Sequence, residues 1–90
     1  MEHKAIIEGA LGLLQPRGSQ YGTVHGNHKL IAALASALIG QKLTPRDIAL
    51  VMVAVKLSRM RVSPDNVDHY MDAINYLAFA GEFSTEKKDD

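Results

Sequence analysis

The chain has 90 residues, 47% of them apolar, and its ten basic and ten acidic side chains give a formal net charge of zero. This length predicts one domain, which we place at residues 1–83, with a charged tail at residues 84–90 that we expect to be disordered. Zero net charge disfavours binding to a nucleic-acid duplex. The absence of cysteine excludes disulfides and thiolate metal sites. With no signal-peptide pattern and no apolar run of membrane length, we expect a cytoplasmic protein with no membrane partner.

Apolar residues recur at helical spacing in the first part of the chain and predict two helices. The first is expected over residues 3–14. Residues 15–26 contain one proline and three glycines, which predicts a loop. The second helix is expected over residues 28–39, with Asn27 as its N-cap and Gly40 as a left-handed C-cap.

The second half of the chain carries two similar helix starts. Thr44 is typical of an N-cap, Pro45 of the first helical position, and Asp47 of the residue that completes a capping box. Ser63 and Pro64 repeat this start and predict a fourth helix after a tight turn.

These elements predict an all-α fold, a small bundle of about four helices with a central antiparallel helical hairpin formed by the last two. Several of the predicted helices are apolar on nearly all sides, so each side has to be buried against other residues. A chain of 90 residues has too few residues to bury all of these sides. We therefore expect a homo-oligomer.

Polar side chains should meet along the seam of the hairpin. Lys56 and Arg59 lie three residues apart on one helix, and Asp68, Asp72 and Asn75 share a face of the next. Charges at a seam between apolar helices are costly unless they are paired. The seam is therefore either an ion-pair network that neutralises itself or a polar site that a bound anion completes. Arginine beside lysine suits a phosphate group.

The same acidic residues allow a metal-dependent alternative. Asp68 and Asp72 are four apart and could hold Mg²⁺, which prefers oxygen ligands and a substrate phosphate. The facing helix offers Lys56 and Arg59 instead of further carboxylates, which weakens the case for an enzyme. The four histidines form no metal-binding pattern, and covalent catalysis has no cysteine or serine-elbow nucleophile.

A set of residues spread over residues 21–82 occurs in a recognisable order: Tyr21-Gly22, Asn27, Gly40, Thr44-Pro45, Asp47, Lys56, Arg59, Asp68, Asp72, Tyr76 and Glu82. This set resembles a family of small phage-encoded helical proteins of largely unassigned function. The resemblance implies a protein that works in the cytoplasm of an infected bacterial host.

The segment from Asp68 to Tyr76 also looks like the second acidic helix of the all-α nucleotide pyrophosphohydrolases, the MazG and dimeric dUTPase group. That resemblance implies hydrolysis of nucleoside triphosphates, with Mg²⁺ held by a Glu-x-x-Glu pair and a Glu-x-x-Asp pair. This chain has no Glu-x-x-Glu, and Asp68 and Asp72 are spaced by four residues. What the resemblance then implies is nucleotide binding without cleavage.

The first hypothesis is therefore a binding module that holds or sequesters a phosphate-bearing small molecule, as small phage anti-defence proteins trap a nucleotide-derived signal. No cofactor is expected. Lys56 and Arg59 are the candidates for phosphate, and Tyr21 for stacking on a base or ribose. Asp72 and Asn75 are the candidates for hydroxyl and amide groups. The remaining candidate ligand-binding residues are Asn27, Asp68 and Tyr76.

Two other hypotheses stay open. One is a reduced MazG-like pyrophosphohydrolase, with Asp68, Asp72 and Glu82 as ligands of Mg²⁺. The other is a structural or protein-interaction module whose polar seam is purely internal. The sequence leaves the choice between a site and an ion-pair network undecided.

Overall fold

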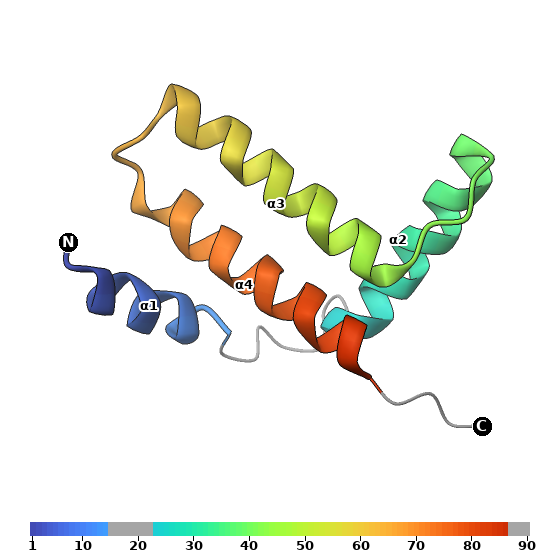
Figure 1. The fold of residues 1–90 in the computed structure, drawn as a ribbon, viewed down its shortest axis with the longest axis horizontal. Helices are drawn as coiled ribbons and strands as arrows, with labels where there is room; N and C mark the ends of the chain where they lie inside the picture. The colour runs from blue at the N-terminus through green and yellow to red at the C-terminus, as the bar shows by residue number, and fades with distance from the viewer. Residues whose placement is uncertain (15–22, 87–90) are drawn as a thin grey trace.

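The computed structural model describes residues 1–14 and 23–86, which form four α-helices and no strand (Figure 1). The helices are α1 (His3–Gly12), α2 (Val24–Ile39), α3 (Pro45–Val62) and α4 (Val67–Thr85). The predicted all-α class with about four helices is confirmed for this part of the chain. Within the same ranges, no helix is both long and apolar enough to cross a membrane.

Helix α2 begins earlier than predicted, because Thr23 and not Asn27 is its N-cap. The hydroxyl oxygen of Thr23 accepts a hydrogen bond from the backbone N–H of Gly26 at 2.9 Å. Asn27 lies inside the first turn. The helix ends as predicted at Gly40, which has a left-handed conformation with φ of 79°.

A serine near the end of α2 fixes the connection to α3. The hydroxyl of Ser36 accepts from the backbone N–H of Leu43 at 2.8 Å and lies 2.6 Å from the carbonyl oxygen of Ala32, to which it donates. Helix α3 then begins with the predicted capping box. The backbone N–H of Asp47 donates to the Thr44 hydroxyl at 3.2 Å, and the N–H of Thr44 donates to the Asp47 carboxylate at 2.9 Å.

The turn between α3 and α4 differs from the prediction, which placed the cap of the fourth helix at Ser63. Ser63 instead ends α3, and Asn66 is the N-cap of α4, with its side chain accepting from the N–H of Asp68 at 3.1 Å. The Tyr70 hydroxyl donates to the carbonyl oxygen of Pro64 at 2.9 Å and holds the turn against α4. Helix α4 also continues through Thr85, so the first two residues of the predicted tail are helical; residues 87–90 lie outside the described ranges.

Helices α3 and α4 form the most extensive contact of the fold, and α1 and α2 attach to this pair at different places. Figure 1 shows α1 beside α4, whereas α2 lies at the other end of the pair and extends away from it. Gly9 lets α1 approach closely, because a Cβ atom at this position would collide with the terminal methyl of Met71. A larger residue at position 9 would therefore require the end of the Met71 side chain to move.

The core is small. Its buried apolar residues are mostly alanines: Ala10, Ala32, Ile48, Ala49, Val53, Met71, Ala73 and Ala80. Among the described residues no large side chain is completely buried, and many leucines, isoleucines and valines are more than one-third exposed. Much of the apolar surface therefore remains in contact with water.

Candidate functional site

A cleft of about 310 Å³ opens between the end of α1 and the middle of α4. It is lined by Leu13, Leu14, Asp72, Asn75, Tyr76 and Phe79. Three of these residues, Asp72, Asn75 and Tyr76, are predicted ligand-binding residues, which the helical spacing brings to one face. The volume is at the lower end of the range for small-molecule sites.

Asn75 joins α4 to the end of α1. It is 8% exposed, and its Nδ2 donates to the carbonyl oxygen of Ala10 at 2.9 Å. Ala10 lies in the last turn of α1, and its carbonyl oxygen also accepts from the backbone N–H of Leu13 at 3.1 Å. Because the amide nitrogen is used in this way, Oδ1 is the Asn75 atom available to accept from a ligand. No donor in the described part of the chain reaches that oxygen.

Asp72 belongs both to the cleft and to an ion pair. Its Oδ2 lies 3.0 Å from Nζ of Lys56 on α3. The side chain of Asp72 is 34% exposed and that of Lys56 is 18% exposed, so the pair is partly shielded from water. The predicted contact between basic and acidic side chains is thus present for these two residues. The lysine neutralises a carboxylate that a ligand could still reach.

Arg59 does not join Lys56 beside the cleft. Positions three apart on a helix differ by about 60° around its axis, so one can face α4 while the other faces outward. Arg59 is exposed, and no carboxylate of the described residues forms an ion pair with it. It lines a shallow depression on α3 together with Val51, Ala54, Val55 and Ser58. This geometry does not place Lys56 and Arg59 so that both could bind one phosphate, as the sequence had suggested.

The other predicted residues also lie outside the cleft lining. Asn27 is exposed in the first turn of α2, and Asp68 is exposed at the start of α4. Tyr21 falls within residues 15–22, outside the described residues. Glu82 follows Asp72 by ten positions on the same helix, which is about 15 Å along the axis. Asp72 and Glu82 therefore cannot be ligands of one metal ion.

Sequence reasoning, which found no metal-binding pattern among the histidines, missed a second polar group, His28. His28 is only 5% exposed. Its Nδ1 lies 2.8 Å from the carbonyl oxygen of Val24, to which it donates, while its Nε2 is buried and has no hydrogen-bond partner among the described residues. The rings of Tyr76, Phe79 and Phe83 lie 5.3–6.3 Å from its ring, centre to centre. A signal was present in the sequence, because these three α4 residues follow one another at helical spacing.

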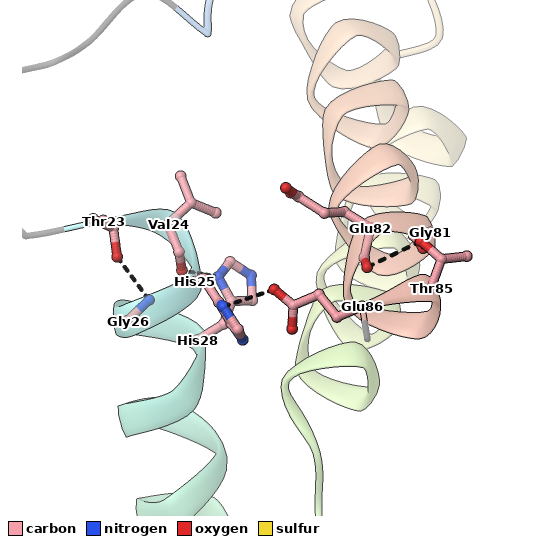
Figure 2. A network of polar contacts seen from close by, with 9 residues as sticks. All are labelled: Thr23, Val24, His25, Gly26, His28, Gly81, Glu82, Thr85 and Glu86. Carbon is pink, nitrogen blue, oxygen red and sulfur yellow. Dashed lines mark hydrogen bonds and ion pairs between the residues drawn. The ribbon is translucent and has the colours of Figure 1, made fainter. Parts of the chain in front are cut away.

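His25 lies next to this aromatic cluster, at the point where α2 meets the end of α4. Figure 2 shows its ring beside Glu86, and its Nδ1 is 3.0 Å from Oε1 of that residue. The ring of His25 also stacks on Phe83 with a centroid distance of 4.8 Å. The junction of α2 with α4 is thus aromatic inside and polar at its edge, whereas the cleft beside α1 has a carboxylate and a carboxamide on its wall.

The cleft suits a small molecule that carries both a ring and hydrogen-bond donors. Tyr76 and Phe79 offer aromatic faces, and their centroids lie 6.0 Å apart at 80°. The oxygens of Asp72 and Asn75 are acceptors and favour hydroxyl or amine groups. Lys56 lies behind Asp72 and is joined to this wall by its ion pair.

These features define the class of protein, a small all-α domain with a ligand-sized cleft beside a buried asparagine. Residues 5–84 match the family described as domain of unknown function DUF6378, and since they make up most of the chain, the chain belongs to this family. Comparison with curated proteins and with solved structures gave no match. The predicted membership of a family without an assigned function is confirmed. The family description names no activity, so the cleft has to indicate the function.

Proposed function

We propose that the protein binds a nucleotide or nucleotide-derived small molecule in the cleft between α1 and α4 and holds it without cleaving it. The observation that carries this proposal is the grouping of Asp72, Asn75 and Tyr76 on one wall of a 310 Å³ cleft. The resemblance to small phage proteins extends the proposal to sequestration of such a signal in the cytoplasm of an infected bacterium.

The proposal gives each wall residue a role. The ring of the ligand packs against Tyr76 and Phe79, and its hydroxyl or amine groups donate to Asp72 and to Oδ1 of Asn75. The phosphate lies at the edge of the cleft, near Lys56. This role for Lys56 requires its Nζ to share its three protons between Asp72 and the phosphate.

The proposal also includes two features of the architecture. We treat α3 and α4 as an antiparallel helical hairpin, which is supported by the Lys56–Asp72 distance of 3.0 Å and by the turn that Tyr70 holds. We also treat the working protein as a homo-oligomer, which is supported by the small core and the many exposed apolar side chains.

Isothermal titration against a panel of nucleotides tests the proposal, with nucleoside triphosphates, cyclic dinucleotides and cyclic ADP-ribose forms included. We expect one of them to bind with measurable heat. In the variant Asp72→Asn, which removes the charge but keeps the shape, we expect binding to weaken by about tenfold or more, the effect of one lost charge-assisted hydrogen bond.

Asp68→Asn is the matched control, because Asp68 lies one turn earlier on α4 and outside the cleft lining. It should leave affinity unchanged. Circular dichroism of both variants checks that the helices persist. If no member of the panel gives heat, or if both variants weaken binding equally, the cleft is not the binding site.

The two polar contacts between helices favour a second function, that of a structural or protein-interaction module. Lys56 pairs with Asp72, and Asn75 donates to Ala10, so in this second function these groups serve solely to hold helices together. In that case Lys56→Met would loosen or dissociate the protein, and no nucleotide would bind.

The pyrophosphohydrolase alternative is tested in the same titrations by assaying pyrophosphate release in the presence of Mg²⁺. Asp68 and Asp72 would have to act without Glu82. Turnover that both Asp68→Asn and Asp72→Asn abolish would replace the binding proposal with this one.

A further inference from the structure

The outer face of α2 is an apolar stripe that no other described part of the chain covers. Helix α2 packs on α3 and α4 with the side that holds His28 and Ala32, both buried. Its other side carries Leu30, Leu34 and Leu38, which are 58%, 56% and 87% exposed. The three leucines are four residues apart and therefore lie above one another on one face.

This outer stripe, defined by Leu30, Ala33, Leu34, Ala37 and Leu38, contains no charge. Residues 30–41 as a whole carry no acidic or basic side chain. The exposed alanines Ala33 and Ala37 leave shallow grooves between the leucines. Leucine ridges that alternate with alanine grooves are the surface on which another helix packs closely.

The spacing of the leucines makes the stripe complementary to a second copy of itself. Leu30 and Leu38 lie at equal distances on either side of Leu34, so the row of leucines reads the same in both directions. A two-fold axis near Leu34 would place Leu30 of one copy opposite Leu38 of the other. Such a self-complementary patch is what a two-fold symmetric interface requires. A stripe without charge offers nothing that would select a charged partner instead.

The exposed surface area of the chain also favours a second copy as the partner. The chain exposes 6894 Å², whereas about 5,200 Å² is expected for a compact monomer of this mass. The surplus exceeds the roughly 800 Å² that each partner buries in a standard stable interface. The radius of gyration of 14.3 Å likewise exceeds the 12 Å or so expected for a compact chain of this length. The exposed surface is therefore large enough to supply an interface of standard size.

We propose that two copies of this chain pair through the outer stripe of α2, in antiparallel contact centred on Leu34. The proposal specifies the interface of the homo-oligomer and is independent of any bound ligand. Sedimentation velocity over a protein concentration series gives the oligomeric state. The wild-type chain is expected to form a dimer, or a larger assembly built from dimers.

Leu34→Glu places two carboxylates together at the axis, and the dissociation constant of the dimer should rise about 100-fold or more. Leu57→Glu on α3 is the matched control, because Leu57 is 55% exposed. Leu11→Glu tests the other exposed apolar row, on α1. Neither control should change the oligomeric state. Mixing Leu34→Glu with a Leu34→Lys chain should restore the dimer, since opposite charges then meet.

A cysteine placed on the stripe gives a second measurement, which does not depend on the charge variants folding. The natural chain has no cysteine, so a single one can form disulfides only between copies. Ala33→Cys, one residue from the proposed two-fold axis, should cross-link rapidly under mild oxidation, and Ala78→Cys, at an exposed alanine of α4, should not. The proposal is overturned if the wild type is monomeric throughout, if Leu11→Glu or Leu57→Glu dissociates it instead, or if Ala78→Cys cross-links as fast as Ala33→Cys.

Discussion

The two N-terminal helices, α1 and α2, are attached to the α3–α4 pair by different kinds of contact. Helix α1 is held by a close approach at Gly9 and by one buried hydrogen bond, from Asn75 to Ala10. Helix α2 is held by aromatic rings of α4 around His28, with an ion-pair distance between His25 and Glu86 at the edge. The first junction leaves polar atoms at a cleft, and the second buries its polar atom.

This difference separates where a ligand would bind from where a second chain would bind. The junction of α1 has acceptor oxygens that a small molecule can reach. The junction of α2 is closed, and what α2 exposes is an apolar stripe on its far side. Variants that loosen one junction should therefore leave the function of the other intact. The following predictions test this separation, and all stabilities are to be compared at one protein concentration because oligomerisation contributes to stability.

The largest effect is expected for His28→Ala, which removes a buried ring from the aromatic cluster. Loss of a large buried side chain leaves a cavity, and we expect the free energy of unfolding to fall by about 2–4 kcal/mol. Urea denaturation measures the loss, and hydrogen exchange should show α2 losing protection before α1. His25→Ala, at the exposed edge of the same junction, should cost less than about 1 kcal/mol. Equal losses for the two variants would mean that burial of His28 is not what holds α2.

The next effect is expected for Asn75→Ala, which removes the donor to the Ala10 carbonyl. That carbonyl also accepts from the N–H of Leu13 at 3.1 Å, so it does not lose every partner. We therefore expect a loss of about 1–3 kcal/mol, with α1 amides exchanging faster and α2 amides unchanged. Asn27→Ala, at an exposed asparagine, should stay within about 0.5 kcal/mol of the wild type. If Asn75→Ala left α1 protection intact, the hydrogen bond would not be what attaches α1.

Local signals in the sequence were read correctly where one residue decides the geometry. Thr44 and Asp47 form the predicted capping box, and Gly40 ends α2. The predicted starts of α2 and α4 were wrong because each helix has two possible N-cap residues a few positions apart. Thr23 caps α2 in place of Asn27, and Asn66 caps α4 in place of Ser63. Only the path of the connecting turn distinguishes such competitors, and that path depends on contacts elsewhere.

The site was predictable only on one helix. Helical spacing placed Asp68, Asp72 and Asn75 on a common face, and the structure brings Asp72 and Asn75 to the cleft but not Asp68. Ala10, the partner of Asn75, is 65 residues away in the chain and contributes a backbone carbonyl, which no side-chain pattern can reveal. The burial of His28 likewise depends on rings about fifty residues later in the chain. Long-range contacts of this kind are set by how helices pack, not by the local sequence.

A smaller effect is expected from a matched pair of glycine variants in α1. Alanine favours a helix over glycine by about 1 kcal/mol. At Gly12 nothing lies within 4 Å of an added Cβ, so Gly12→Ala should stabilise the protein by about 0.4–1 kcal/mol. At Gly9 the added atom meets the end of the Met71 side chain, which must move. In thermal unfolding, the free energy of unfolding of Gly9→Ala should therefore be about 1–2 kcal/mol lower than that of Gly12→Ala. If the two variants were equal, close approach would play no part in attaching α1.

The smallest effect lies on α3, outside both junctions, and concerns pH. Hydrogen bonds from the Thr44 backbone and side chain lower the pKa of Asp47 below its usual value. A lowered pKa in the folded state means that the stabilisation is fully present above the unfolded pKa of about 3.9 and is lost as the pH falls through the folded pKa. Because Asp47 is partly exposed to solvent, the loss should be small. Asp47→Asn should make the free energy of unfolding less dependent on pH between neutral pH and acid. In hydrogen exchange, the order in which α1 and α2 lose protection should stay as in the wild type. A change in that order would show that the capping box supports one of the junctions, and the two attachments would then not be independent.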